Sequence, residues 1–415
     1  MYNIGMRSLR KYCYIAFVSA ALLPWNATAV NHEALTARLF VQNKNTNAVE
    51  RMLVQTLQSI KEGRLQQALD YVDQLLTISP NFALAHLIHG DLLSAKARIL
   101  NNFGDANTAD VTRIQDFKEE AEIRIRNYFD RNRGLTQPNM LVELSEKQSH
   151  VLFVDTARSR LYVYEKGQGD VLRYVADYYV TIGKNGIGKK DQGDKRTPIG
   201  VYFASRKLNR PLPDLYGDAA YPLNYPNEID SYERKTGSGI WIHGTPRDTY
   251  SRPPRASDGC VVLSNPDMKA LQEVLQAGNT PVVIGVNFQW VNPDSVRHQD
   301  RHKADLKSAI EQWRKDWASQ NTDAYLSHYT SDFFYSEGDL SRWTSYKRQI
   351  QAAKPKVSVN LSEVSMFTYP NSKRNMVVVD FEQEYVSAAL RNVMKKRQYW
   401  VQENGEWKIL YEGSA

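Results

Sequence analysis

The first third of the chain shows helical periodicity. Apolar residues recur at spacings of three and four along residues 53–93, LVQTLQSIKEGRLQQALDYVDQLLTISPNFALAHLIHGDLL, and this spacing is typical of amphipathic helices. Pro80 ends one helical segment, because proline cannot continue a helix. The stretch FKEEAEIRIRNYF extends the pattern, and the turn-forming GLTQPN breaks it. We therefore predict a helical region over residues 30–146.

The period changes to two from Ser149. SHVLFVDTARSRLYVYEKGQGDVLRYVADYYVTIGK alternates and is rich in β-branched and aromatic residues, as strands are. Further strands are predicted for TPIGVYFASRK, SGIWIHGT, CVVLSN and TPVVIGVNFQWV, with a long Pro/Tyr/Asn-rich segment at residues 212–234. The pattern predicts a mostly-β domain over residues 147–291.

The last part of the chain, residues 292–415, starts with the linker-like NPDSV and a helical stretch, DLKSAIEQWRKDWASQN. Four strand-like stretches follow: KVSVNLSEVSMF, RNMVVVDFEQEYVS, RQYWVQENG and EWKILYEG. The W…W…DAYLSHY…DF opening and the closing WKIL resemble the packing motifs of the nuclear-transport-factor-2-like (NTF2-like) fold. These are packing motifs, so the resemblance implies an α+β cone and carries little information on chemistry.

Small residues and proline in the helical region resemble those of a tetratricopeptide helix pair, at Gly63, Ala68, Pro80 and Gly90. Such a region is either a docking surface for a protein partner or a structural appendage. The predicted fold class is thus multidomain α+β, with a helical tetratricopeptide-like region, a central mostly-β domain and a C-terminal cone.

The first 29 residues have the layout of a secretory signal peptide. Arg7, Arg10 and Lys11 precede an apolar run at residues 12–23, which is too short to span a membrane comfortably. Ala27-Thr28-Ala29 supplies a cleavage site. We expect an exported, periplasmic protein without an integral membrane segment after cleavage. Losing three cations takes the formal charge from +7 to +4, and a weakly basic protein suits a polyanionic wall.

Cleavage would leave one cysteine, because Cys13 lies in the signal segment and Cys260 lies in the central domain. A lone thiol has no internal disulfide partner in an oxidising compartment. Cys260 is therefore an inert packed residue, half of an intermolecular bridge, or a reactive nucleophile.

Three other patterns carry little weight. GKNGIGKK nearly matches a phosphate-binding loop, but Lys190 replaces the Mg²⁺-binding hydroxyl and no helix follows. The pairs His298/His302 and His86/His89 lack accompanying ligands for a metal. Basic residues are dispersed, which argues against nucleic-acid binding. We expect no cofactor, no metal and no nucleic acid.

The chemistry points to His243 and Cys260. His243-Gly244 ends one predicted strand, and Cys260 begins another seventeen positions later. Two such strand ends can lie side by side, and a nearby imidazole activates a thiol by handling its proton. The Gly244 carbonyl can hold the second imidazole nitrogen, and the N–H groups of Gly259 and Cys260 can stabilise an oxyanion.

These motifs resemble the L,D-transpeptidase (YkuD-type) catalytic domain, whose signature is His-Gly, a spacer and Ser/Thr-x-Gly-Cys. Here they are His243-Gly244 and Ser257-Asp258-Gly259-Cys260, supported by VLFVDTARSRLYVYEKG, VTIGK and TPIG. The resemblance implies an enzyme that acts on peptidoglycan stem tetrapeptides. It implies that Cys260 attacks the diamino-acid carbonyl, that His243 is the general base, that Ser257 fixes the turn, and that Asp258 occupies a variable position.

One position departs from the family pattern. Many members carry an arginine two residues after the cysteine, where this chain has Val262. Arg255 or Arg252 in the spacer could bind the anionic stem peptide instead. The segment LYGDAAYPLNYPNEIDSYERKTGSGIW resembles a subgroup in which some members carry the same C-terminal cone and act as L,D-carboxypeptidases. The alternatives to a transpeptidase are therefore a carboxypeptidase, with water as acceptor, and an inactive wall-binding scaffold.

Overall fold

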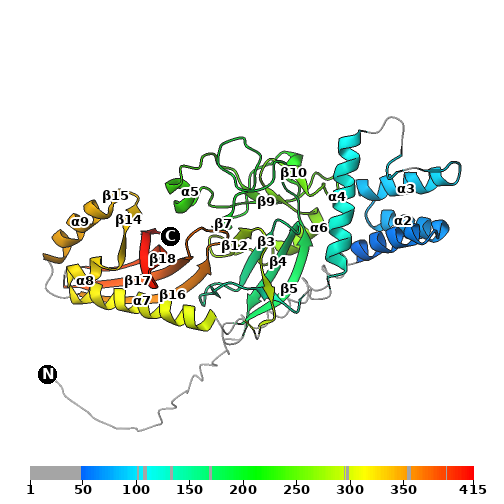
Figure 1. The fold of residues 1–415 in the computed structure, drawn as a ribbon. Coiled ribbons are helices and arrows are strands. Elements are labelled where there is room, and N and C mark those ends of the chain that lie inside the picture. The colour runs from blue at the N-terminus through cyan, green and yellow to red at the C-terminus, as the bar shows by residue number, and fades with distance from the viewer. Residues whose placement is uncertain are drawn as a thin grey trace, which may run out of the picture.

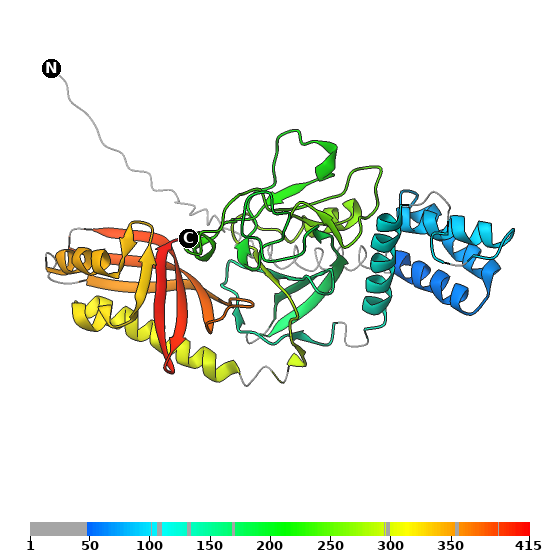
Figure 2. The ribbon, with the colours of Figure 1, turned by 45° about the horizontal axis from the view of Figure 1, so that its top comes forward.

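The computed structural model describes residues 48–100, 102–105, 110–130, 134–167, 171–293, 295, 299–352, 357–388 and 390–415. The predicted signal peptide, Cys13 and His298 lie outside these residues. The described parts form a row, with the helical region at one end, the mostly-β domain in the middle and the C-terminal domain at the other end (Figures 1 and 2).

The helical region contains a helix at residues 48–61, α2 (Leu65–Ile78), α3 (Ala83–Ala95) and α4 (Val111–Tyr128). Buried apolar residues of the periodic stripe, including Leu53, Val72 and Ile88, form its core. Pro80 lies in the turn between α2 and α3, as predicted. Helix α4 begins at residue 111, earlier than the periodic stretch suggests, because the Asp110 side chain accepts a hydrogen bond from Thr112 N. A helical region is confirmed; its tetratricopeptide character stays a prediction.

The central domain is built on two main sheets. The larger sheet has the order β5-β4-β3-β12-β7, with β3 (His150–Asp155), β4 (Arg160–Lys166), β5 (Leu172–Tyr179), β7 (Gly200–Phe203) and β12 (Pro281–Gly285). The smaller has the order β11-β9-β8, with β8 (Ala220–Pro222), β9 (Trp241–His243) and β11 (Val261–Val262). A core containing Leu152, Tyr178 and Ile242 joins the two sheets.

Short elements complete this domain. They are β6 (Ile182–Gly183), which pairs with β10 (Arg255–Ser257), the 3₁₀ helix η2 (Asp214–Tyr216), α5 (Glu228–Tyr232) and α6 (Asn265–Leu271). The glycine-rich GKNGIGKK stretch forms turns after β6 and is not followed by a helix. It therefore lacks the helix N-terminus on which a phosphate-binding loop depends.

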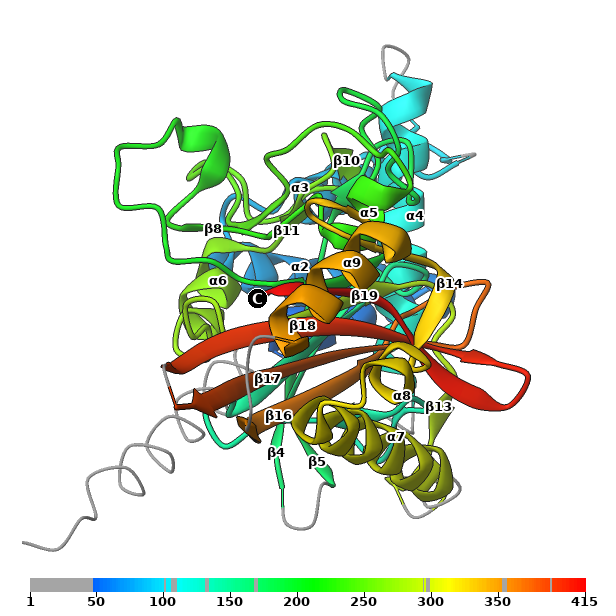
Figure 3. The same ribbon diagram turned by 90° about the vertical axis from the view of Figure 1, so that its left-hand side faces the viewer.

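The C-terminal domain is a strongly curved sheet covered by helices (Figure 3). Its helices are α7 (Gln299–Ser319), α8 (Thr322–Leu326) and α9 (Leu340–Ala352). The sheet has the order β15-β14-β19-β18-β17-β16-β2, in which β2 is the short strand Val142–Glu143. Its strands are β14 (Tyr329–Tyr335), β15 (Gly338–Asp339), β16 (Val357–Thr368), β17 (Met376–Ser387), β18 (Arg391–Glu403) and β19 (Glu406–Ser414). The predicted cone is confirmed, and Trp313, Trp343 and Trp400 lie in its core.

The segment after α4 ties the domains together. Strand β1 (Gln137–Pro138) pairs with β13 (Trp290–Val291), and β2 (Val142–Glu143) adds an edge to the C-terminal sheet beside β16. The outer face of the larger central sheet packs on that sheet, and Phe153 shares a core with Phe367 and Tyr399. Among the described residues, no helix is both long and apolar enough to cross a membrane.

Candidate active site

Parallel pairing of β9 with β11 brings His243 and Cys260 to neighbouring strands. The register sets Val262 opposite His243 and Val261 opposite Ile242. Cys260 is the residue directly before β11, so the strand starts one position later than the sequence predicts. The Cys260 thiol donates to the carbonyl of Gly239 at 3.5 Å. No hydrogen bond joins it to His243 in the described part of the chain, so proton transfer between them needs a small rearrangement or a substrate.

The His243 imidazole is buried and held in one orientation. Its Nδ1 lies 2.6 Å from the carbonyl oxygen of Gly244, and the Tyr216 ring packs edge-on at 5.1 Å. A carbonyl only accepts, so Nδ1 carries the proton and Nε2 keeps its lone pair. Burial lowers the pKa of His243 to about 4, and the nearby Arg252 charge contributes to the lowering. The imidazole is therefore neutral at physiological pH and able to accept a proton.

The Cys260 thiol is half-buried and also neutral. Burial raises its pKa to about 11, and the charge of Asp258 acts in the same direction. The N–H of Trp241 and the cations Arg252 and Lys189 oppose this effect. The free protein thus holds an uncharged thiol near an uncharged base, and the thiolate has to be formed as the sulfur attacks.

The turn before Cys260 is fixed by hydrogen bonds. Ser257 Oγ donates to the Cys260 carbonyl at 2.7 Å and accepts from Gly259 N at 3.2 Å. Gly259 has φ of +122°, and a Cβ there would lie 2.7 Å from the carbonyl oxygen of Arg196. Thr197 Oγ1 donates to the Gly259 carbonyl at 3.0 Å. Ser257 therefore has the predicted contacts of a turn-fixing residue.

The oxyanion role of Gly259 stays a prediction. In the free protein its N–H donates to Ser257 Oγ inside the turn at 3.2 Å. Gly259 also supplies a backbone conformation and a close approach that a side chain would prevent. The N–H of Cys260 stays a predicted donor.

The spacer residues have different surroundings. Arg255 forms an ion pair with Glu119 of α4 at 2.8 Å, which makes it a poor candidate for binding a stem peptide. Asp258 is solvent-exposed, with Lys195 3.6 Å away. Arg252 is half-buried, and its charge acts on both Cys260 and His243. The Asp258 charge acts on Arg252, but no carboxylate among the described residues forms a close ion pair with it. Of the two predicted arginines, Arg252 is the one beside the site.

Sequence reasoning missed several residues around the site. Tyr216, from the Pro/Tyr-rich segment, packs on Trp241, which follows that segment. Their ring centroids are 4.7 Å apart. Asn265 donates to the Thr245 carbonyl at 2.8 Å, and a Cβ at Gly244 would lie 2.1 Å from its Oδ1. Lys189, from the glycine-rich loop, is buried against Asp194 at 2.8 Å. The aromatic content of the segment is a sequence signal for the Tyr216 contact only. The contacts of Asn265 and Lys189 have no local signal.

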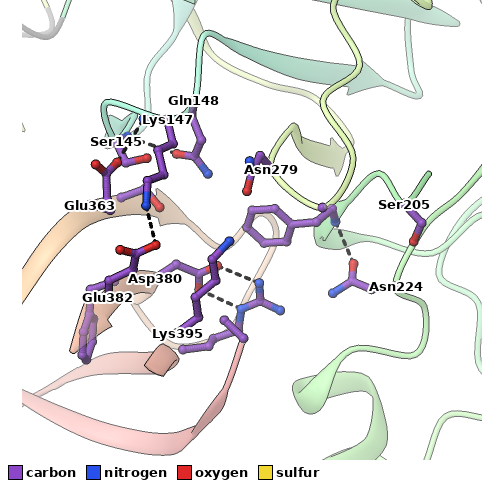
Figure 4. Close-up of a pocket in the computed structure, with 16 residues that line it drawn as sticks. Ser145, Lys147, Gln148, Ser205, Asn224, Asn279, Glu363, Asp380, Glu382 and Lys395 are labelled. Atoms are coloured by element: carbon purple, nitrogen blue, oxygen red, sulfur yellow. Dashed lines mark hydrogen bonds and ion pairs between the residues drawn. The ribbon is translucent and has the colours of Figure 1, made fainter. Parts of the chain in front are cut away.

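Two of the cavities outside this site involve the C-terminal domain. One of about 330 Å³ lies between the central and C-terminal domains, where Lys147 pairs with Glu382 at 2.6 Å and Arg397 pairs with Asp380 at 2.7 Å. Figure 4 shows side chains of both domains facing each other across it. Its charged groups are largely paired, so it has the features of a polar domain interface.

The second cavity, of about 560 Å³, is the mouth of the cone. Buried Lys347 lies there over the rings of Trp317 and Trp343, at 4.2 and 4.1 Å. Burial lowers the pKa of Lys347 to about 8. Residues from α9 and the sheet meet in this mouth only in the fold, so no local sequence pattern marks it.

The described residues contain no group of three or more His, Cys, Asp or Glu side chains placed to hold a metal. His86 Nε2 lies 2.6 Å from the Pro80 carbonyl, and His89 lies 3.1 Å from Asp73. His302 is exposed on α7. These histidines have no arrangement typical of a metal site.

Comparisons with known proteins agree with this architecture. Residues 149–284 match the L,D-transpeptidase catalytic domain, and residues 305–413 match the Cds6 C-terminal NTF2-like domain. The chain is 26% identical over 214 residues to the probable L,D-transpeptidase YbiS of Escherichia coli (strain K12), covering 46% of this chain. The match spans 66% of YbiS, just under two thirds of its length.

Two solved structures resemble most of the described chain. Bd1075 of Bdellovibrio bacteriovorus is 28% identical, with a TM-score of 0.57, covering 68% of this chain and 99% of Bd1075. The helical cell shape determining protein Pgp2 of Campylobacter jejuni is 26% identical, with a TM-score of 0.56, covering 72% of this chain and 99% of Pgp2. This chain therefore carries an L,D-transpeptidase catalytic domain followed by a C-terminal NTF2-like domain.

Proposed function

We propose that this protein is a cysteine L,D-transpeptidase that acts on peptidoglycan stem tetrapeptides in the periplasm. The observation that carries the proposal is the local geometry of β9 and β11. The neutral imidazole of His243, with Nε2 able to accept a proton, lies at the end of β9. The Cys260 thiol lies directly before the paired strand β11, inside a domain of this family. The domain boundaries at residues 29, 146 and 291 belong to the same proposal.

The proposed chemistry has two acyl transfers. Cys260 Sγ attacks the carbonyl carbon of the diamino-acid residue while its proton passes to His243 Nε2. The tetrahedral intermediate collapses, the C–N bond to the terminal D-residue breaks, and the imidazolium protonates the leaving amine. An acceptor amine then attacks the thioester, gives its proton to His243, and releases Cys260, which regains that proton as a thiol.

Arg252 supplies the cation that the family pattern would place at position 262. Its charge acts on the thiol, and it forms no close ion pair with a carboxylate among the described residues, so its guanidinium suits a carboxylate of the stem peptide. Cys260 N–H is the proposed oxyanion donor. Tyr216 and Trp241 form an aromatic wall next to His243.

The second candidate function is L,D-carboxypeptidase, in which water attacks the same thioester. The C-terminal NTF2-like domain favours this function. The subgroup that this chain resembles includes L,D-carboxypeptidases that carry the same C-terminal domain. The comparison with Pgp2 adds a link to cell shape, which we extend to this protein only as part of the proposal.

Mass analysis of products from purified tetrapeptide muropeptides tests all three alternatives. We expect crosslinked dimers from a transpeptidase and tripeptides from a carboxypeptidase. Cys260→Ala should abolish turnover, because it removes the attacking sulfur, and should leave the unfolding temperature nearly unchanged. Full activity in Cys260→Ala would refute the proposed nucleophile. Peptidoglycan binding without product from the wild type would favour the scaffold.

A further inference from the structure

The loop between His243 and Cys260 is held by the N-terminal helical region. Tyr250 N donates to the carbonyl of Asn81 at 2.9 Å, and the Asn81 side chain donates to the Arg247 carbonyl at 3.1 Å. The Tyr250 ring packs on Phe82 with centroids 5.0 Å apart. Figure 1 shows α4 standing between the central domain and α2 and α3. The loop therefore has one side on the catalytic domain and one on the helices.

A buried carboxylate lies at the centre of this contact. Glu120 of α4 is 1% exposed, and its Oε1 accepts from Ser251 Oγ at 2.8 Å. The same oxygen accepts from Arg124 Nε at 3.0 Å. Arg124 also pairs with Glu50 at 2.5 Å, so Glu120 belongs to a buried ion cluster. Removing one member of such a cluster leaves an uncompensated buried charge, which is costly. The position of the Glu120 carboxylate is therefore strongly fixed.

The cluster reaches Arg252 along two routes. Ser251, the residue before Arg252, is bound directly by Glu120. The Arg124 guanidinium lies 3.8 Å from the centre of the Tyr179 ring, and Tyr179 OH donates to the Arg252 carbonyl at 3.0 Å. The backbone on both sides of Arg252 is thereby fixed relative to Cys260. Thr181 Oγ1 also donates to the Arg252 carbonyl at 3.0 Å, and Thr181 forms a β-bridge with Val262, two residues after Cys260, so this backbone lies next to the site. The Arg252 charge contributes to the field at Cys260, together with Asp258 and Lys189.

We propose that Glu120, on the helical region, is a positioning residue for the active site. Through its hydrogen bond to Ser251 it holds the 245–256 loop, and with it the position of Arg252 relative to the Cys260 thiol. The consequence for turnover rests on the proposed function, whereas the placement of the charge can be tested without any substrate.

Charge-selective alkylation of Cys260 tests the placement. Iodoacetate is anionic and iodoacetamide is neutral, so the ratio of their rate constants reports the cation beside the sulfur. We expect Arg252→Met to lower this ratio about fivefold, as for a unit charge acting over a few ångströms at a half-exposed site. Ser251→Ala removes the donor of the Ser251–Glu120 hydrogen bond and Glu120→Ala removes its acceptor. Both should lower the ratio about twofold or more, because the loop is released.

Controls separate positioning from stability. Glu122→Ala removes an exposed carboxylate from the same helix and should keep the wild-type ratio. Global destabilisation would change both rate constants together and leave their ratio unchanged. Ser251→Ala removes only a hydroxyl, so it remains informative if Glu120→Ala folds poorly. Adding Ser251→Ala to Glu120→Ala should not lower the ratio further, since both substitutions remove the same hydrogen bond.

Two results would overturn the proposal: a wild-type ratio in both Ser251→Ala and Glu120→Ala, or an unchanged ratio in Arg252→Met. If the wild type turns over tetrapeptide, kcat/KM should fall about tenfold in Ser251→Ala, mainly through KM, since a displaced cation weakens substrate binding. Absence of turnover in the wild type would count against the proposed function and would leave the alkylation result standing.

Discussion

At the residue scale, the proposed nucleophile, Cys260, and the proposed base, His243, are both uncharged in the free protein. The two pKa values, about 11 for Cys260 and about 4 for His243, are shifted apart mainly by burial. A preformed thiolate–imidazolium pair would require the opposite order of the two values. Activation therefore depends on the arriving substrate, which brings the reacting carbonyl and expels water.

The reactivity of Cys260 toward iodoacetamide should follow from this. Below the thiol pKa the thiolate fraction rises tenfold per pH unit, so the rate constant should rise about tenfold per unit from pH 7 to pH 10. Mass spectrometry of the peptide that contains Cys260 gives the rate. His243→Asn should show the same slope. A plateau near neutral pH in the wild type, lost in His243→Asn, would instead indicate an ion pair.

The identity of these two residues could be predicted from the sequence, but their surroundings could not. His243-Gly244 and Ser257–Cys260 are local motifs, and the Gly244 and Ser257 contacts are local too. Arg255 and Arg252 look equivalent in the sequence. They differ because Glu119, 136 positions upstream, pairs with Arg255, and such a contact between distant residues has no local signal.

At the element scale, the Ser257–Cys260 turn sets where the sulfur lies. Gly259→Ala should fail for two reasons, since φ of +122° is unfavourable for L-residues and its Cβ would meet the Arg196 carbonyl. We expect a loss of about 1–3 kcal/mol in the free energy of unfolding, measured by denaturant titration. Turnover should fall by about 10² because Cys260 moves.

Gly193→Ala is the matched control for that substitution. Gly193 also has positive φ, +79°, but a Cβ added there would have nothing within 4 Å. It should lose about 1 kcal/mol of stability and keep its turnover. Equal turnover in Gly259→Ala and the wild type would contradict a turn that positions Cys260.

Long elements were predictable and short ones were not. Strands β3, β4, β17 and β18 follow from alternation over many residues, and the helices of the first region follow from a repeated apolar stripe. Strands β1, β2 and β10 have two or three residues each. They exist because partner strands lie beside them, so no pattern inside them could reveal them.

At the scale of the whole molecule, the catalytic and C-terminal domains share one core. Phe203 of β7 and Phe367 of β16 pack with centroids 6.1 Å apart. Arg397 and Tyr399 of β18 also contact Glu228 at the start of α5, with Tyr399 OH donating at 2.8 Å. Helix α5 belongs to the same inserted segment as Tyr216. The C-terminal domain therefore supports one end of the segment that walls the active site.

Phe367→Ala should reveal this shared core. Truncating a fully buried phenylalanine costs about 3–5 kcal/mol, and Phe367 packs against strands of both domains. Phe333→Ala removes an equally buried ring from the core inside the C-terminal domain.

Hydrogen exchange followed by mass spectrometry can localise each loss of stability. Phe367→Ala should raise exchange in β3 and β12 as well as in β16, whereas Phe333→Ala should raise it mainly within the C-terminal domain. Unchanged protection of β3 and β12 in Phe367→Ala would mean that the two domains are stabilised independently, and that the C-terminal domain does not support the active-site wall.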